Sequence, residues 1–202
     1  MRRALLILTA AVAVIAPTLA LPADAEAQKV VSTKMGGGGS PHETVEYKVG
    51  GATVTIIYGR PYMKGRSLET LAPTGKVYRT GADEATTFTT DKALQIGKLS
   101  VPAGTYTIYT LPGSPWQLIV NKQTGQWGTD YTEGQDLGRT PMTASTLASP
   151  SEQLTLAIVG SNLELHWGTM KQSVAISAAK LGNRDASARR AGTARRRLPP
   201  PA

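Results

Sequence analysis

Residues 44–58 read TVEYKVGGATVTIIY, and this stretch decides the class of the fold. Apolar and polar side chains alternate with a period of two on both sides of the pair Gly50-Gly51. That period is the pattern of a β-strand with one buried face. Two glycines between such runs predict a hairpin with a primed turn, because glycine readily adopts a positive φ at both central positions. The stretch therefore predicts two paired antiparallel strands.

The same alternation recurs toward the C-terminus in short segments separated by turn residues. These segments are 105–111, 116–120, 154–159, 163–167 and 173–176. Short, regularly spaced strands are typical of a β-sandwich or barrel. Residues 40–177 are therefore expected to form one all-β domain, a single antiparallel β-sandwich or partly closed barrel. Only residues 67–71, just before Pro73, are expected to form a short helical turn.

The last of these hairpins turns at Gly160-Ser161 and makes a specific prediction about its two faces. Alternation places Leu165 and Trp167 on the inward face. It places Glu164 and His166 on the outward face.

The N-terminal residues 1–27 have the pattern of a secretory signal peptide. Arg2 and Arg3 precede an apolar run that ends at Pro17, and small residues follow at Ala25 and Ala27. The run is shorter than the ~20 residues that a membrane span needs. We therefore expect an exported protein, periplasmic or secreted, that does not span the membrane once the signal is removed. Residues 28–39 end in four glycines and are expected to be a flexible linker.

The C-terminal residues 178–202 carry most of the chain's net charge of +8. Seven Lys and Arg stand there against one Asp, with few large apolar residues to bury. This composition predicts a disordered basic tail. An anionic envelope surface is the partner expected on charge grounds, and the alternative is a solvated extension without a specific role. Nucleic acid is not expected, because no aromatic residues interleave with the tail's charges to stack on bases.

The residue types that are rare in this chain exclude several kinds of chemistry. The sequence contains no cysteine, which excludes disulfides, thiol nucleophiles, iron–sulfur clusters and the usual structural zinc sites. His42 and His166 are its only histidines, and neither has a partner at a spacing that indicates a metal. No phosphate-loop, dinucleotide or serine-hydrolase motif is present. We therefore expect neither a metal nor a cofactor.

Charged residues gather on two connections that flank the predicted helical turn. These candidate binding residues are Arg60, Lys64, Arg66, Arg79, Asp83 and Glu84. Guanidinium groups on neighbouring loops suit recognition of a carboxylate, phosphate or sulfate, and the two carboxylates could accept hydrogen bonds from hydroxyl groups. The residues predict a site for a small anionic or polyhydroxylated ligand, in a binding or accessory domain of the cell envelope.

A purely structural role is the first alternative for the same residues. The turn between Arg79 and Glu84 could bring these two side chains into an ion pair. Arg60 and Arg66 could instead bond carbonyl groups of irregular backbone.

A small hydrolase or isomerase is the second alternative, with His42 or Glu84 as general base. His42 stands at the entry to the domain and could approach the loop of residues 79–84. Asp83 and Glu84 would face opposite ways on a strand, an objection that a turn would remove.

A sugar-stacking groove is the third alternative. Its candidates are Tyr106, Tyr109, Trp116 and Trp127. Tyr106 and Trp116 occupy inward positions of an alternating pattern, which favours a role in the core for these two.

Several strings in residues 40–176 resemble a bacterial exported family, domain of unknown function 2911. The most specific is Arg79-Thr80-Gly81-Ala82-Asp83-Glu84-Ala85-Thr86, in which the family more often has Asn at the position of Asp83. Tyr58-Gly59-Arg60-Pro61 precedes it, and Leu165-His166-Trp167-Gly168 closes the region. The resemblance implies an exported, β-rich domain. It implies no established activity and no catalytic residues.

Overall fold

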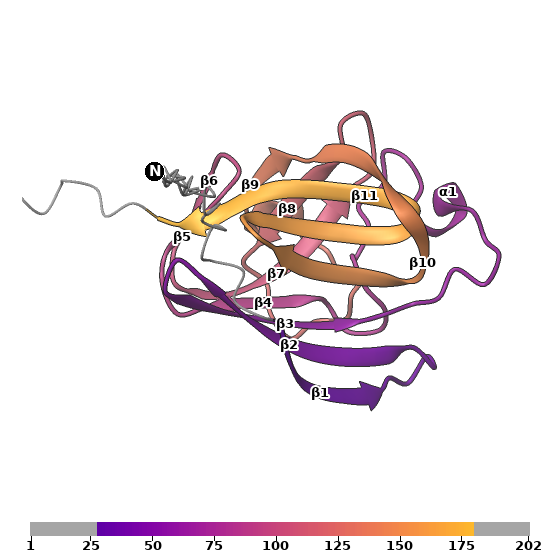
Figure 1. The fold of residues 1–202 in the computed structure, drawn as a ribbon, viewed down its shortest axis with the longest axis horizontal. Coiled ribbons are helices and arrows are strands. Elements are labelled where there is room, and N and C mark those ends of the chain that lie inside the picture. Colours follow the sequence, from indigo (N-terminus) through magenta and orange to yellow (C-terminus); the bar gives the residue numbers. More distant parts are fainter. Residues whose placement is uncertain (1–27, 180–202) are drawn as a thin grey trace, which may run out of the picture.

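A computed structural model describes residues 28–179 as two antiparallel sheets packed into a sandwich (Figure 1). The first sheet has seven strands in the order β1-β2-β3-β4-β7-β8-β9, and the second has four in the order β10-β11-β5-β6. The bounds of the first sheet are β1 Lys29–Met35, β2 Pro41–Val49, β3 Ala52–Gly59, β4 Thr87–Thr90, β7 Gly104–Leu111, β8 Gln117–Asn121 and β9 Asp136–Pro141. Those of the second are β5 Leu94–Ile96, β6 Leu99–Val101, β10 Thr143–Val159 and β11 Asn162–Ala178. The predicted β-sandwich is confirmed.

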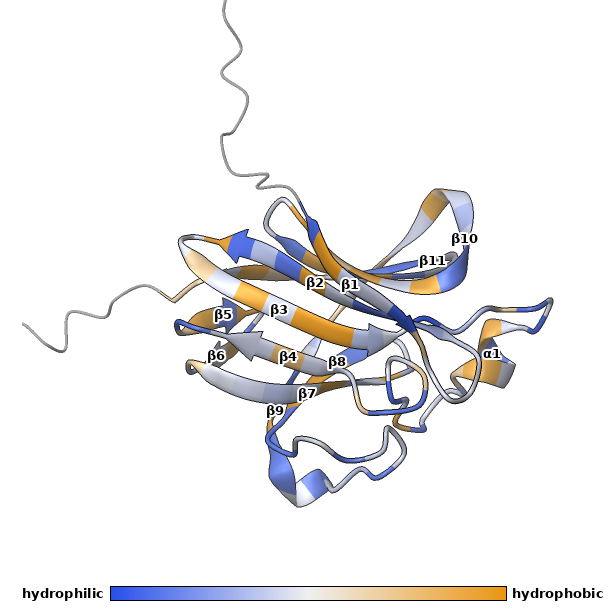
Figure 2. Ribbon diagram, turned by 90° about the horizontal axis from the view of Figure 1, so that it is seen from below, coloured by the Kyte–Doolittle hydropathy of each residue, from blue (hydrophilic) through white to orange (hydrophobic). Residues whose placement is uncertain are grey.

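The hairpin that decided the fold class forms β2 and β3, which pair from His42↔Gly59 to Val49↔Ala52. Gly50 and Gly51 both have positive φ, at 53° and 78°, as a primed turn requires. In Figure 2, β3 carries orange apolar bands separated by near-white bands of intermediate hydropathy. The apolar face of this pair packs into the core between the sheets.

The helical turn is confirmed at α1 (Leu68–Leu71). The Ser67 hydroxyl accepts a hydrogen bond from the Thr70 amide at 3.2 Å, which satisfies one free N–H of the first turn. A 3₁₀ turn, η1 (Glu133–Gln135), was not expected.

Two expectations about the ends of the domain are wrong. Residues 29–35, expected within a flexible linker, form strand β1, which pairs with β2 from Lys29↔Glu46 to Met35↔Pro41. The glycine run makes the connecting turn, in which the Gly36 amide bonds the Ser40 carbonyl at 2.9 Å. The expected tail begins inside the second sheet, because Ala178 still pairs with Leu94. The predicted signal peptide and the rest of the predicted tail lie outside the described residues.

Strand β11 also differs from expectation, because the segments expected at 163–167 and 173–176 are one continuous strand. Glu164, expected to face outward, is buried. Its carboxylate accepts hydrogen bonds from His166 Nε2 at 2.8 Å and Lys171 Nζ at 2.7 Å. These two partners offset the cost of burying the charge.

Candidate functional site

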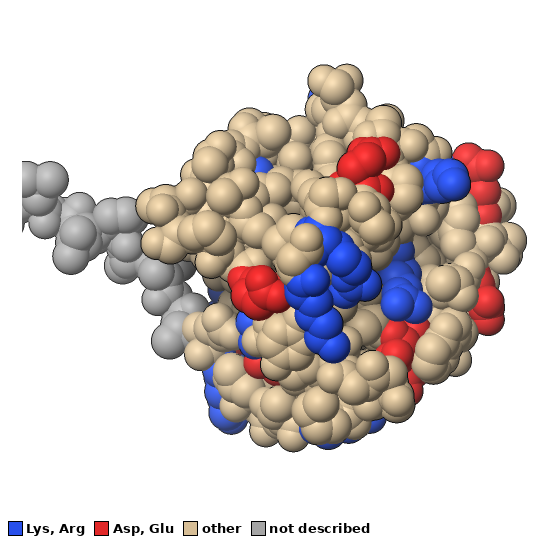
Figure 3. Space-filling view, turned by 90° about the vertical axis from the view of Figure 1, so that its right-hand side faces the viewer, with Lys and Arg blue, Asp and Glu red and all other residues tan. Residues whose placement is uncertain are grey.

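The predicted binding residues lie on connections at one end of the sandwich, beside α1. The segments are 60–67 between β3 and α1, 77–86 before β4, and the glycine turn 36–40 between β1 and β2. Figure 1 shows the β1–β2 turn and α1 at the same end. Figure 3 looks onto this end, and Lys and Arg side chains gather near the centre of the face.

Four of the six predicted residues line one pocket of about 350 Å³, which we call the cationic pocket. They are Lys64, Arg66, Arg79 and Asp83, and the remaining wall comes from the glycine turn 38–40 and from Pro61, Tyr62 and Ala82. Such a volume is within the range of small-molecule sites.

The three basic side chains of the cationic pocket are not neutralised by neighbours. Within residues 28–179, none of Lys64, Arg66 and Arg79 has a carboxylate within salt-bridge distance. Arg79 Nε donates to the Gly81 carbonyl at 3.1 Å, and Arg66 donates to the carbonyls of Met63 and Tyr62 at 2.9 and 2.8 Å. These bonds orient each guanidinium while leaving its charge free to act on a ligand. The ion pair considered between Arg79 and Glu84 does not form.

Backbone strain is concentrated around this pocket. Within the described chain, the non-glycine residues with positive φ are Lys64 (49°), Thr80 (54°) and Asp83 (61°). Two of them line the cationic pocket, and the third lies in the same loop as Asp83. Such residues persist only where the surrounding structure holds them, and they cluster at functional sites.

The loop 79–86 is held in this conformation by the segment 126–128. The Gly128 amide donates to the Asp83 carbonyl at 2.9 Å, and the Ala85 amide donates to the Gln126 carbonyl at 3.1 Å. The buried Thr86 hydroxyl donates to the Thr80 carbonyl at 2.9 Å across the turn. The strained turn is therefore a fixed part of the pocket wall.

His42 does approach this loop, and it bridges the two adjacent carboxylates. Its Nε2 lies 3.1 Å from Asp83 Oδ2, and its Nδ1 lies 3.5 Å from Glu84 Oε2. The left-handed turn at Asp83 turns both carboxylates toward one imidazole. Asp83 also accepts a bond from the Gly38 amide at 3.3 Å, which ties the glycine turn to the loop.

These three side chains are also the metal-ligand cluster found among the described residues. The two carboxylates lie at opposite ring nitrogens, and the lone pairs of these nitrogens point in different directions. One potential ligand atom from each side chain lies within 4.8 Å of those of the other two. The His42–Asp83 contact is a hydrogen bond, whereas the largely exposed Glu84 meets the ring only in a longer ion-pair contact. His42 stands 41 positions before Asp83, so the sequence suggested its approach to this loop but not its contact with both carboxylates.

Arg60, a predicted ligand residue, lies outside the cationic pocket and joins the two sheets. Its Nη1 forms an ion pair with Glu43 on β2. Its Nε donates to the Leu154 carbonyl at 3.2 Å and its Nη2 to Thr155 Oγ1 at 2.9 Å, both on β10. The structural alternative is therefore the better description of Arg60.

We expect Arg60→Met to lower the free energy of unfolding by about 2–3 kcal/mol, because the largely buried Glu43 loses its partner and the shortened side chain cannot bond β10. Urea denaturation measures the change. Lys48→Met on the exposed surface of β2 is the control, with an expected change within about 0.5 kcal/mol. A loss below about 1 kcal/mol for Arg60→Met would contradict the role as a clamp.

Glu84 also lies apart from the cationic pocket. Its side chain is 62% exposed, and it lines neither the cationic pocket nor its neighbour. Its contact with His42 is the one polar side-chain interaction found for it among the described residues.

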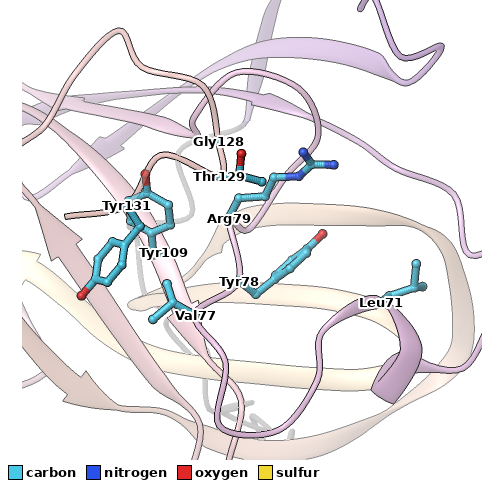
Figure 4. A pocket seen from close by; sticks show the side chains of 8 residues that line it. All are labelled: Leu71, Val77, Tyr78, Arg79, Tyr109, Gly128, Thr129 and Tyr131. Atoms are coloured by element: carbon cyan, nitrogen blue, oxygen red, sulfur yellow. The ribbon is translucent and has the colours of Figure 1, made fainter. Parts of the chain in front are cut away.

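A second pocket of about 340 Å³ adjoins Arg79, and we call it the tyrosine pocket (Figure 4). Its aromatic lining comes from Tyr78, Tyr109 and Tyr131, and Leu71, Val77, Arg79, Gly128 and Thr129 complete it. Burial raises the pKa of Tyr78 above its ordinary value. Burial, together with the hydrogen bond to Asp136, raises the pKa of Tyr131 to about 12. Both hydroxyls therefore stay protonated and act as donors at neutral pH.

Sequence reasoning missed most of this second pocket. Of the four aromatic residues considered for a sugar groove, only Tyr109 lines it. Tyr106 is buried in the core, Trp116 packs against the core, and Trp127 is exposed beside the site. Tyr78 and Tyr131 carried no periodic signal, because both stand in irregular connections.

No curated protein and no solved structure matches the chain. Residues 40–176 match the model of the family described as Protein of unknown function (DUF2911). The match spans the sandwich from the start of β2 to near the end of β11 and contains most of both pockets. The chain belongs to this family.

Proposed function

We propose that this protein is an exported binding domain of the cell envelope that holds a small oxyanion in the cationic pocket. The observation that carries the proposal is that Lys64, Arg66 and Arg79 line one pocket without an ion-pair partner in the described chain. The N-terminal signal pattern supports the exported location. Within residues 28–179 no helix is long and apolar enough to cross a membrane.

The charge balance of the cationic pocket favours an anion. Three cations stand against one carboxylate, that of Asp83, which is largely buried and already bonded to His42 and the Gly38 amide. Two guanidinium groups and an ammonium group match the several oxygens of a phosphate or sulfate. A free oxygen of Asp83 suits a hydroxyl group on the same ligand.

A binding role is supported over general-base chemistry by the position of His42. The imidazole is buried and lines neither pocket, so a ligand in either pocket would not touch it. Its contacts hold Asp83 and the glycine turn in place, which makes it a positioning residue.

We expect Arg79→Met to weaken binding of inorganic phosphate at least tenfold in isothermal titration calorimetry on the full chain. The substitution removes a charge-assisted interaction of about 1.5–3 kcal/mol. Methionine keeps an aliphatic stem where the Arg79 side chain packs against Gly128, so the fold should be retained. Sulfate should behave like phosphate.

Lys122→Met is the matched control, because this exposed lysine lies outside both pockets and the substitution removes the same charge. If the basic tail alone attracted the anion, both variants would bind phosphate as tightly as the unaltered chain. That result, equal weakening by both variants, or no phosphate binding by the unaltered chain would refute the proposed site.

A further inference from the structure

We infer that the cationic pocket and the tyrosine pocket are two halves of one site, whose ligand is a six-membered ring that carries an oxyanion. The inference rests on the proposed function, since it assigns the oxyanion to the cationic pocket. It specifies the chemical class of the ligand, because the tyrosine pocket would hold the ring that carries the oxyanion.

Arg79 joins the two halves, because its side chain lines both pockets. A Cβ added at Gly128 would lie 2.8 Å from Arg79 Cδ and 3.2 Å from its Cβ, so the stem of Arg79 lies directly on this glycine. The bond from Nε to the Gly81 carbonyl then holds the guanidinium plane. Figure 4 shows this guanidinium on the side away from Tyr109 and Tyr131. A ligand that occupies both pockets would therefore bond this guanidinium with its charged end and extend along the Arg79 stem toward the tyrosines.

The tyrosine pocket presents ring surfaces, because its hydroxyl groups already have partners. Tyr78 donates to the Gly81 carbonyl at 3.2 Å, and Tyr131 donates to Asp136 at 2.8 Å. Tyr109 accepts a bond from the Gln126 side chain at 3.1 Å. Tyr109 is only 1% exposed, so the ring surface open to a ligand comes from Tyr78 and Tyr131. Aromatic faces whose hydroxyls are already bonded suit the apolar face of a planar or pyranose ring. The volume of about 340 Å³ accommodates one such ring.

The walls of the tyrosine pocket are held rigidly. Tyr78 stacks on the buried Trp167 with ring centroids 5.6 Å apart, and its backbone exchanges two hydrogen bonds with Thr110, of 2.7 and 3.0 Å. Tyr109 and Tyr131 meet edge to face at 5.0 Å. A ligand would therefore lose little affinity to ordering of the protein.

Titration of the full chain with inorganic phosphate, phenyl phosphate and glucose 6-phosphate tests the inference. We expect at least one of the two ring compounds to bind tenfold or more tightly than inorganic phosphate. The two compounds distinguish an aromatic from a sugar ring. Thr129→Tyr, which fills the tyrosine pocket from its exposed rim, should abolish this advantage while leaving phosphate affinity within twofold.

Thr124→Tyr is the matched control, because this exposed threonine lies outside both pockets. It should leave all three affinities unchanged. Leu71→Trp fills the pocket from the side of α1 and serves as the second variant if Thr129→Tyr does not fold. Far-ultraviolet circular dichroism establishes the folded state of each variant.

The outcomes separate this inference from the function on which it rests. The two-part site alone is refuted if phosphate binds but neither ring compound binds more tightly. It is also refuted if the tighter binding of a ring compound persists in both Thr129→Tyr and Leu71→Trp. Absence of phosphate binding overturns the proposed function as well.

Discussion

Trp167→Ala is expected to lower the free energy of unfolding by about 3–5 kcal/mol, the usual cost of removing a fully buried large aromatic side chain. Trp167 is only 2% exposed and lies in the core, where it supports Tyr78. Its indole N–H has no hydrogen-bond partner in the described chain, so the expected loss comes from packing and from the cavity left behind.

Urea denaturation followed by circular dichroism measures this change. The control is Trp127→Ala, since Trp127 is 47% exposed and should cost less than about 1 kcal/mol. A loss for Trp167→Ala below about 1 kcal/mol would show that the core closes around the missing ring. If the tyrosine pocket binds a ring, this variant should also reduce the advantage of phenyl phosphate over phosphate, because Tyr78 loses its support.

Gly59→Ala is expected to cost about 3 kcal/mol, at the upper end of the range for inserting a methyl group into a packed interior. A Cβ at this position would lie 2.4 Å from the Ala82 carbonyl oxygen and 2.9 Å from the Ala82 amide nitrogen. Both are backbone atoms of the loop that carries Arg79 and Asp83, so the clash cannot be relieved by turning a side chain. We therefore expect weaker phosphate binding in addition to the loss of stability.

Gly134→Ala is the control for this substitution. No atom lies within 4 Å of a Cβ at Gly134, and its φ is not in the left-handed region. Its free energy of unfolding should change by less than about 0.5 kcal/mol. If Gly59→Ala were as stable as this control, the close approach of β3 to the loop would not be required for folding.

The strands that the sequence predicted correctly are those whose alternation spans several residues. In β2 and β3 one face is buried and the other is more accessible, so the alternation repeats often enough to be recognised. Strands β7 and β8 are buried on both faces over most of their length, and short apolar runs bounded by turn residues indicated them. Strands β5 and β6 have three residues each, which is too few for a period of two to be distinguished. Strand β1 was missed because its residues are exposed throughout and its pairing comes from the edge of β2.

The sequence predicted one site formed by six residues on neighbouring loops, but the structure separates two of these residues from the other four. Lys64, Arg66, Arg79 and Asp83 line the cationic pocket, whereas Arg60 faces β10 and Glu84 faces His42 and solvent. A side chain's direction in irregular backbone depends on φ and ψ at single residues, such as the left-handed turn at Asp83. Composition and spacing do not report those angles.

By itself, the amino-acid sequence determined that this chain folds as antiparallel sheets and that basic side chains gather on two of its connections. These properties follow from periodicity and composition along the chain, which are local. The tertiary structure alone decided that His42 meets Asp83, that Trp167 supports Tyr78, and that Arg79 adjoins both pockets. Each of these contacts joins residues far apart in sequence, and their geometry is set by the pairing and packing of whole strands.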